Sequence, residues 1–162
     1  MLVYMLSLHY LCDMSYTSIL YHIVFRTKHS IQAIDIQHER ELYAYILGYV
    51  RNTNSKLIRL GGMPDHIHML VDIHPSIAVA NFVRDLKRET SKWLTANQHF
   101  PLFQGWGDGY AALTYSAKDK DMIVNYIKNQ KEHHKIVSFA DEFRNWLQES
   151  GIELPYPNHL LD

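Results

Sequence analysis

The segment "SKLIRLGGMPDHIHMLVDI", residues 55–73, decides the fold because it predicts two strands joined by a tight connection. Residues 55–64 are largely apolar and end in Gly-Gly and Pro, and residues 66–73 form a second apolar run. A link this short between two strand patterns is typical of a β-hairpin. The second run is unusual because it contains two imidazoles, His66 and His68, at alternate positions.

The segments on either side of this hairpin extend it into an α+β domain. The order β-α-β-β-α-β predicts a ferredoxin-like split βαβ fold. We expect a four- to five-stranded, mainly antiparallel sheet with helices on one face and further C-terminal helices. The remaining expected strands are 17–28 and 110–116, and the expected helices are 35–54, 76–97, 118–135 and 139–151, with Asp35 and Ser76 as helix caps.

Length and composition are those of one globular domain. The chain has 162 residues, of which 47% are hydrophobic and 20% charged, and this balance excludes a disordered protein. We expect residues 1–13 to be an upstream extension, with Met14 as an alternative start, 14–151 to be a single domain and 152–162 to be a tail. The apolar stretch at the start is too short to span a bilayer, and we expect no membrane contact.

Charge and cysteine content limit the classes of partner and compartment. The formal net charge is −1, so any binding of nucleic acid depends on a local basic patch rather than on bulk charge. The single cysteine, Cys12, excludes an internal disulfide framework and favours a reducing, cytoplasmic compartment.

His66 and His68 share one face of their strand because strand side chains alternate. Their Cα atoms are about 6–7 Å apart in an extended strand, so both rings can converge on one metal ion or one phosphate. Asp65 precedes them, and its carboxylate could hydrogen-bond one of the rings from behind and orient it for metal binding. Two ordinary half-buried histidines are the alternative, and the rest of the chain has to decide between them.

The helix expected over 118–135 carries a tyrosine and an amide on one face. Tyr126 and Gln130 are four residues apart, and this spacing places them one above the other. A tyrosine phenol can attack a phosphodiester when it is activated, because its pKa is near 10. A divalent ion would polarise the phosphoryl oxygens, and two histidines with Gln130 would supply three ligands. A tyrosine that only packs its ring is the alternative.

The chain resembles the single-tyrosine transposases of the HUH class (histidine–hydrophobic–histidine), which mobilise insertion sequences as single-stranded DNA. The resemblance spans most of residues 15–150. It is carried by "MPDHIHMLV" at 63–71, "YIKNQKEHH" at 126–134, "YHIVFRTK" at 21–28 and "GWGDGYAALTYS" at 105–116.

This resemblance implies a catalytic ferredoxin-like domain whose histidines face the helix-lined side of the sheet. It implies that His66, His68 and Gln130 bind Mg²⁺ or Mn²⁺ and that Tyr126 is the nucleophile, which forms a 5′-phosphotyrosine link. It also implies recognition of hairpins near the element ends. Members are usually homodimers in which the tyrosine helix of one subunit completes the histidine site of the other. The sequence leaves open whether this chain does so in cis or in trans.

Several side chains are candidates for DNA contact, since phosphates need local positive charge even on a neutral protein. On the helix expected over 76–97 we expect the basic residues to share one face while Asp85 and Glu89 point elsewhere. The alternative for these cations is a solvated helix face without a ligand. The aromatic candidates could stack on unpaired bases, and the alternative for them is that they cover the edge of the core. The basic candidates are Arg84, Lys87, Arg88, Lys92, Arg51, Lys56 and Arg59, and the aromatic candidates are Trp106 and Tyr110.

Two other functions remain open. The first is a domesticated or inactive relative that binds hairpin nucleic acid without cleavage. RNA-recognition domains of this fold place aromatic residues on the sheet, whereas the strand here presents histidines and Leu70. The second is a histidine-triad phosphohydrolase, but that motif needs a third histidine where Leu70 stands.

Overall fold

The computed structural model describes residues 16–133 and 138–153, and its element order confirms the predicted ferredoxin-like arrangement. The expected 1–13 extension and most of the expected tail lie outside the described residues. The strands are β1 (Leu20–Arg26), β2 (Lys56–Met63), β3 (His66–Asp72) and β4 (Ala111–Tyr115). The helices are α2 (Glu39–Asn52), α3 (Val79–Ala96), α4 (Lys120–Lys128), α5 (Gln130–His133) and α6 (Phe139–Glu149), with 3₁₀ turns at Lys28–Ser30 and Ala117–Asp119.

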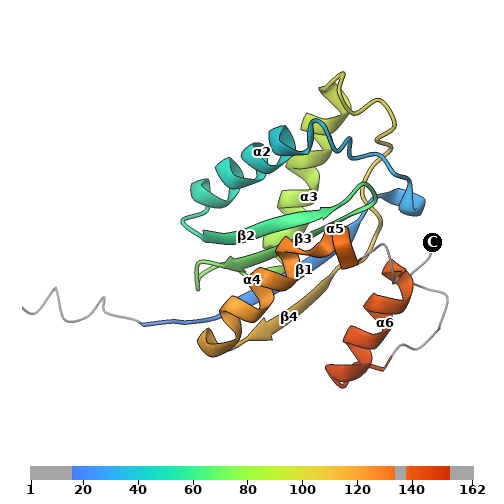
Figure 1. Ribbon diagram of the computed structural model, residues 1–162. Helices are drawn as coiled ribbons and strands as arrows, with labels where there is room; N and C mark the ends of the chain where they lie inside the picture. Colours follow the sequence, from blue (N-terminus) through green and yellow to red (C-terminus); the bar gives the residue numbers. More distant parts are fainter. Residues whose placement is uncertain (1–15, 134–137, 154–162) are drawn as a thin grey trace, which may run out of the picture.

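The four strands form one antiparallel sheet in the order β2-β3-β1-β4. Helices α2 and α3 cover one face of this sheet, and α4, α5 and α6 lie against the other (Figure 1). The two central strands, β3 and β1, are therefore covered on both sides. None of the helices in the described part of the chain is long and apolar enough to cross a membrane.

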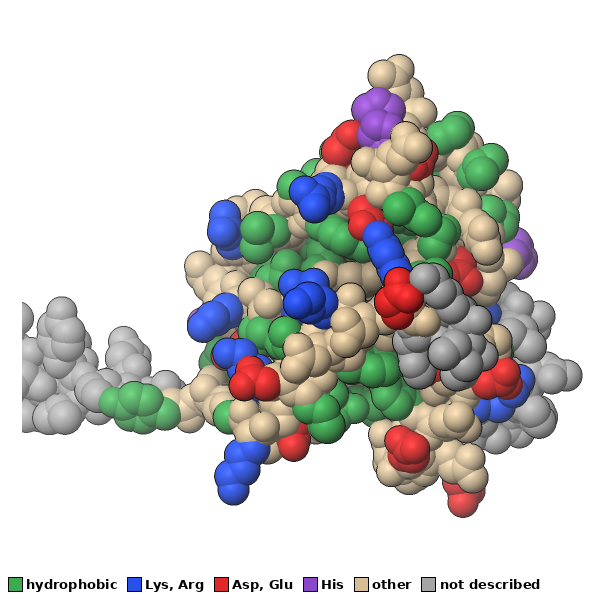
Figure 2. Space-filling model, in the orientation of Figure 1, with side chains coloured by type: hydrophobic (Ala, Val, Ile, Leu, Met, Phe, Trp, Pro, Cys, Tyr) green, Lys and Arg blue, Asp and Glu red, His purple; other side chains and the backbone are tan. Residues whose placement is uncertain are grey.

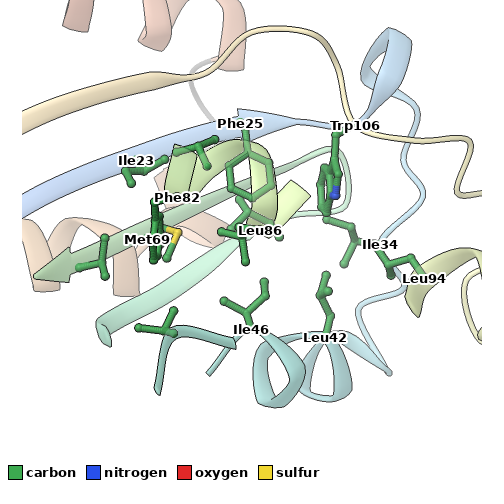
Figure 3. Packing of buried hydrophobic residues seen from close by; sticks show 14 of the residues in the cluster. Ile23, Phe25, Ile34, Leu42, Ile46, Met69, Phe82, Leu86, Leu94 and Trp106 are labelled. Carbon is green, nitrogen blue, oxygen red and sulfur yellow. The ribbon is translucent and has the colours of Figure 1, made fainter. Parts of the chain in front are cut away.

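The main hydrophobic core fills the layer between the sheet and helices α2 and α3. On α2 the buried residues Leu42, Ile46 and Val50 follow a four-residue spacing, which places them on one helical face. They meet side chains from α3, including Phe82 and Leu86, and alternate residues of the central strands (Figure 3). The strand residues in this layer include Ile23, Phe25, Ile67, Met69 and Val71.

Three predicted helix boundaries were wrong. Helix α3 begins after Ala78, and Ser76 instead contacts His74 Nδ1 through its hydroxyl at 2.7 Å. Helix α2 begins after His38, and the Asp35 carboxylate accepts a bond from the Gln37 amide in the turn before it. The helix expected over 118–135 is interrupted at Asn129, which separates α4 from α5. In the first two cases the polar side chain is satisfied by a local turn.

Gly61 permits the close approach of α4 to the sheet. A Cβ atom at this position would lie 3.0 Å from both the Cγ2 and the carbonyl oxygen of Ile127. We expect Gly61→Ala to lower the free energy of unfolding by about 1–3 kcal/mol, because an added methyl overpacks this contact. Thermal or urea unfolding measures the loss. A Cβ at Gly48 on α2 meets nothing within 4 Å, so Gly48→Ala is the control and should be neutral or stabilising. Equal stability of both variants would contradict the proposed close contact.

Candidate active site

The two histidines of the hairpin lie together on the face of the sheet that the C-terminal helices cover. His66 and His68 are 1% and 0% exposed, and their ring centroids are 5.0 Å apart. In register, His68 lies opposite Val24 of β1 and Gly61 of β2. Both histidines therefore face α4 and α6, whereas α2 and α3 pack on the opposite side.

A hydrogen-bond partner orients each of the two imidazoles. Asp65 Oδ1 lies 2.7 Å from His66 Nδ1, which is the supporting position expected for this carboxylate. His22 Nε2 lies 3.2 Å from His68 Nδ1. When both Nδ1 atoms donate a hydrogen to these partners, the Nε2 atoms are the ones that can bind a metal.

His22 was not predicted as a site residue. It is fully buried on β1 and shares the histidine face because it lies opposite Leu70, two residues from His68 along β3. Burial lowers the pKa of His22 to about 3, so the ring is neutral and can accept a hydrogen bond. One feature of the sequence could have identified His22. It is a histidine within the apolar run of β1, as His66 and His68 are within the apolar run of β3.

Tyr126 and Gln130 approach the same histidines from α4 and α5. The Tyr126 ring centroid lies 5.9 Å from that of His68, and Gln130 is fully buried. The break at Asn129 leaves the two residues on adjacent short helices rather than on one continuous helix. In this single chain the histidines, the tyrosine and the amide come together in cis.

The site also contains Glu142 of α6, which the sequence analysis did not identify. Tyr126 Oη donates to Glu142 Oε1, and Gln130 Nε2 lies 3.4 Å from the same oxygen. Burial raises the pKa of Glu142 to about 7. A possible signal was a single carboxylate on the apolar face of an amphipathic helix, next to Phe143.

Aromatic residues of α6 cover the histidines on the side away from the sheet. Phe139 stacks on His66 with centroids 4.2 Å apart, and Trp146 meets the His22 ring edge-on at 4.3 Å. A pocket of about 380 Å³ opens between α4 and α6 and is lined in part by Tyr115, Tyr126 and Trp146. The tyrosine is therefore reachable from this side, whereas the histidines are covered.

The donor set fits a divalent ion. One ligand atom from each of His66, His68 and Glu142 lies within 4.8 Å of the other two. Gln130 Oε1 is buried and has no hydrogen-bond partner among the residues that the structure describes, which suits an oxygen that binds a cation. Oxygen ligands favour Mg²⁺ or Mn²⁺, and imidazole accepts many divalent ions.

The basic residues predicted on α3 lie on the opposite side of the sheet from the histidines. Arg84, Arg88 and Lys92 are exposed, as expected. Asp85 and Glu89 do not point elsewhere, because Asp85 pairs with Arg84 and Arg88 at 3.0 Å and Glu89 pairs with Arg88 and Lys92. This face is therefore a mixed-charge network.

Lys87 and Trp106 do not have the exposed positions that the DNA-contact prediction required. Lys87 Nζ donates to the carbonyls of Gly107 and Gly109 and so anchors the loop before β4. Trp106 is 8% exposed, packs against Phe25 and donates from Nε1 to the Thr90 hydroxyl at 2.9 Å. The indole is part of the core, which is the covered position given above as the alternative to stacking on DNA bases.

Of the other predicted cations, Arg59 shares the histidine face of the sheet. Arg59 on β2 is opposite Leu70, two residues along β3 from His68. Arg51 and Lys56 are exposed at the end of α2 and the start of β2, and Tyr110 is 37% exposed. Lys and Arg side chains occur over α2, β2 and the start of α4, with acidic residues among them (Figure 2).

Replacing His22 should weaken metal binding without unfolding the protein. His22→Leu removes the imidazole that contacts His68 Nδ1 and places an apolar side chain in this buried position. We expect Mn²⁺ affinity to fall by about 10–100-fold, as for other partners of metal-binding histidines. Isothermal titration calorimetry measures this change, with the exposed His29→Leu as the control. Unchanged affinity in a folded His22→Leu protein would show that His68 needs no such partner.

Comparison with known proteins agrees with this fold. The sequence profile of the IS200-like transposases matches residues 15–130. A transposase for insertion sequence element IS200 from Salmonella typhimurium is 30% identical over 126 residues, covering 72% of this chain and 79% of its own. The ISDra2 transposase TnpA from Deinococcus radiodurans is 25% identical over 119 residues, covering 69% of this chain and 84% of its own.

Solved structures with a similar fold are also transposases. A candidate transposase from Deinococcus radiodurans R1 superposes with a TM-score of 0.57 at 27% identity, covering 73% of this chain and 95% of its own. A REP-associated tyrosine transposase, solved with a REP hairpin, has a TM-score of 0.55 at 15% identity and covers 76% of both chains, and this likeness concerns the fold. The fold and these matches define the class of the protein as a transposase. Within that class, the chain belongs to the IS200-like transposase family.

Proposed function

We propose that this transposase cleaves and rejoins single-stranded DNA at insertion-sequence ends through a 5′-phosphotyrosine intermediate. The observation that carries the proposal is the convergence of Tyr126 and Gln130 on His66 and His68 within one site. A nucleophile beside a set of metal-binding side chains is the arrangement that phosphodiester attack requires.

In this reaction the Tyr126 oxygen loses its proton and attacks the scissile phosphorus. A bond from phosphorus to the tyrosine oxygen forms, and the bond to the 3′ oxygen breaks. The departing oxygen takes up a proton and becomes a free 3′-hydroxyl. This hydroxyl later attacks another phosphotyrosine, which releases Tyr126 and rejoins the strands. Each step exchanges one phosphodiester for another, so the reaction needs no external energy source.

Each remaining site residue has a role in this proposal. His66, His68 and Gln130 would hold Mg²⁺ or Mn²⁺, which polarises the phosphoryl oxygens when bound. Asp65 would orient His66 through the 2.7 Å contact to Nδ1. The ring of Tyr126 lines the pocket between α4 and α6, and this pocket would admit the strand to be cut.

The proposed substrate is single-stranded DNA with hairpins near the element ends. A structural neighbour was solved with a REP hairpin, and this supports a hairpin partner here. Among the predicted basic contacts, Lys56 and Arg59 lie on β2 and Arg51 lies near the end of α2. Arg84, Arg88 and Lys92 would have to contact a strand that passes around the sheet. The resemblance to the family also supports a homodimer. It further supports a location in the cytoplasm, because the DNA of the element lies there.

A covalent-adduct assay tests this function. Purified protein is incubated with labelled single-stranded DNA that carries the sequences flanking its own gene, with Mg²⁺, with Mn²⁺ or with EDTA. We expect a protein–DNA adduct that resists denaturation and requires the metal. Absence of an adduct on both flanks in either metal, with retained binding of the DNA, would overturn the proposal.

A binding protein without cleavage is the second candidate. The observation that favours it is the cover over the histidines, because Phe139 stacks on His66 and both rings are nearly inaccessible. A DNA phosphate would reach the histidines only if α6 moved. Retained hairpin binding with no adduct in the same assay would be the expected result for such a domesticated relative.

A further inference from the structure

Glu142 is the acidic side chain that the structure adds to the histidine pair, and it lies beyond the residues that match the family profile. That match ends at residue 130, whereas Glu142 belongs to α6 (Phe139–Glu149). We propose that Glu142 is a metal ligand, which joins His66 and His68 in holding the divalent ion. This inference rests on the proposed function, because it concerns the ion of the same site.

The first argument is geometric. A carboxylate oxygen of Glu142 and one nitrogen from each of His66 and His68 all lie within 4.8 Å of one another, and all three residues are buried. Three donors that surround one ion at about 2.0–2.2 Å must themselves lie within about 4.4 Å of one another. Small side-chain adjustments are therefore enough to bring these atoms onto one centre.

The second argument concerns the preference of the ion. Mg²⁺ and Mn²⁺ are bound mainly by carboxylate, carbonyl and water oxygens, whereas sites made only of imidazole suit zinc, copper or nickel. Two histidines and one amide would supply a single, neutral protein oxygen. A carboxylate adds a second oxygen and a negative charge, and so makes the site more suitable for Mg²⁺ or Mn²⁺.

The third argument concerns how Glu142 reaches the site. The neighbouring residues Phe143 and Leu147 pack against Val24 and Ala111 of the sheet, so apolar contacts hold this helix in place. The helix thereby buries a carboxylate, and burial alone disfavours its charged form. Tyr126 Oη and Gln130 Nε2 donate to Glu142, but these are neutral groups. A dication bound between Glu142 and the two histidines would favour the charged carboxylate more strongly than these neutral donors do.

Metal titration tests the assignment independently of cleavage. Mn²⁺ is titrated by calorimetry into wild type, Glu142→Gln and Glu142→Asp, with Glu149→Gln, an exposed position on the same helix, as the control. We expect at least about a tenfold loss of affinity in Glu142→Gln, a smaller loss in Glu142→Asp, and wild-type affinity in the control. Thermal unfolding without metal shows whether each variant is folded.

Two further readouts separate this proposal from its alternatives. Tyr126→Phe should keep Mn²⁺ affinity, because Tyr126 contacts Glu142 but is not itself a ligand. Mn²⁺ should also slow hydrogen exchange of the amides of α6 in wild type and not in Glu142→Gln, since the ion would fix the helix to the sheet. Equal Mn²⁺ affinity in wild type and Glu142→Gln, with binding lost in His66→Ala, would overturn the role of Glu142 and leave the proposed function standing. Absence of Mn²⁺ binding by wild type would overturn both.

Discussion

A Tyr126→Phe protein is expected to form no covalent adduct with single-stranded DNA while it still binds the hairpin. The substitution removes only the phenolic oxygen, which in our proposal forms the bond to phosphorus. The ring contacts with His68 and Trp146 remain possible for phenylalanine, so the fold should persist. Adduct yield should fall by at least about 10³-fold, the order of effect seen when a nucleophile is removed from an active site.

The measurement is denaturing electrophoresis of labelled DNA after incubation with Mg²⁺ or Mn²⁺, beside a native gel that reports binding. Tyr45→Phe is a suitable control, because Tyr45 lies on α2 and stacks on Trp93, on the other side of the sheet. An undiminished adduct in Tyr126→Phe would show that another side chain is the nucleophile. Loss of hairpin binding together with the adduct would indicate that Tyr126 is mainly a structural residue.

A second large effect is expected for His68→Ala. His68 is the more central of the two histidines, since it contacts His22 Nε2 at 3.2 Å and lies near Tyr126 and Trp146. In our proposal His68 is a direct metal ligand, so its removal should lower Mn²⁺ affinity by more than the 10–100-fold expected for loss of a supporting partner. Metal-dependent cleavage should fall to background.

Calorimetry with Mn²⁺ and the adduct assay measure these two effects in the same preparations. The exposed loop residue His74 provides the control His74→Ala, which should bind metal and form adduct as wild type does. Circular dichroism establishes that His68→Ala is folded, because the lost ring leaves a buried cavity. A folded His68→Ala protein with wild-type Mn²⁺ affinity would show that the metal lies elsewhere.

Features that depend on local patterns were predicted from the sequence. The hairpin at 55–73, the alternation of His66 and His68, and the four-residue spacing of Tyr126 and Gln130 are properties of neighbouring residues. The order of elements then selects the ferredoxin-like sheet, and the structure confirms it. Local spacing together with the family resemblance was therefore sufficient for the fold and for His66, His68, Tyr126 and Gln130, which gather in the site.

Features that depend on distant partners were not predicted. His22 and Glu142 join the site from β1 and α6, and their contacts with His68 and Tyr126 span 46 and 16 residues. The sequence likewise gave no indication that the Trp106 indole would donate to the Thr90 hydroxyl, although a covered position was one of the two alternatives for this residue. The helix caps failed for a different reason, because Asp35 and Ser76 are satisfied by turns that compete with capping.

The two-sided burial of β3 has a consequence for how this sequence can change. Its even-numbered residues His66, His68 and Leu70 face the C-terminal helices, and the odd-numbered residues Ile67, Met69 and Val71 belong to the main core. One strand thus carries two interleaved sets of constraints, one from foldability and one from chemistry. An inactive descendant could lose His66 and His68 and still keep Ile67, Met69 and Val71, because the main core requires them for folding. The alternating apolar residues of β3 would then still indicate its ancestry.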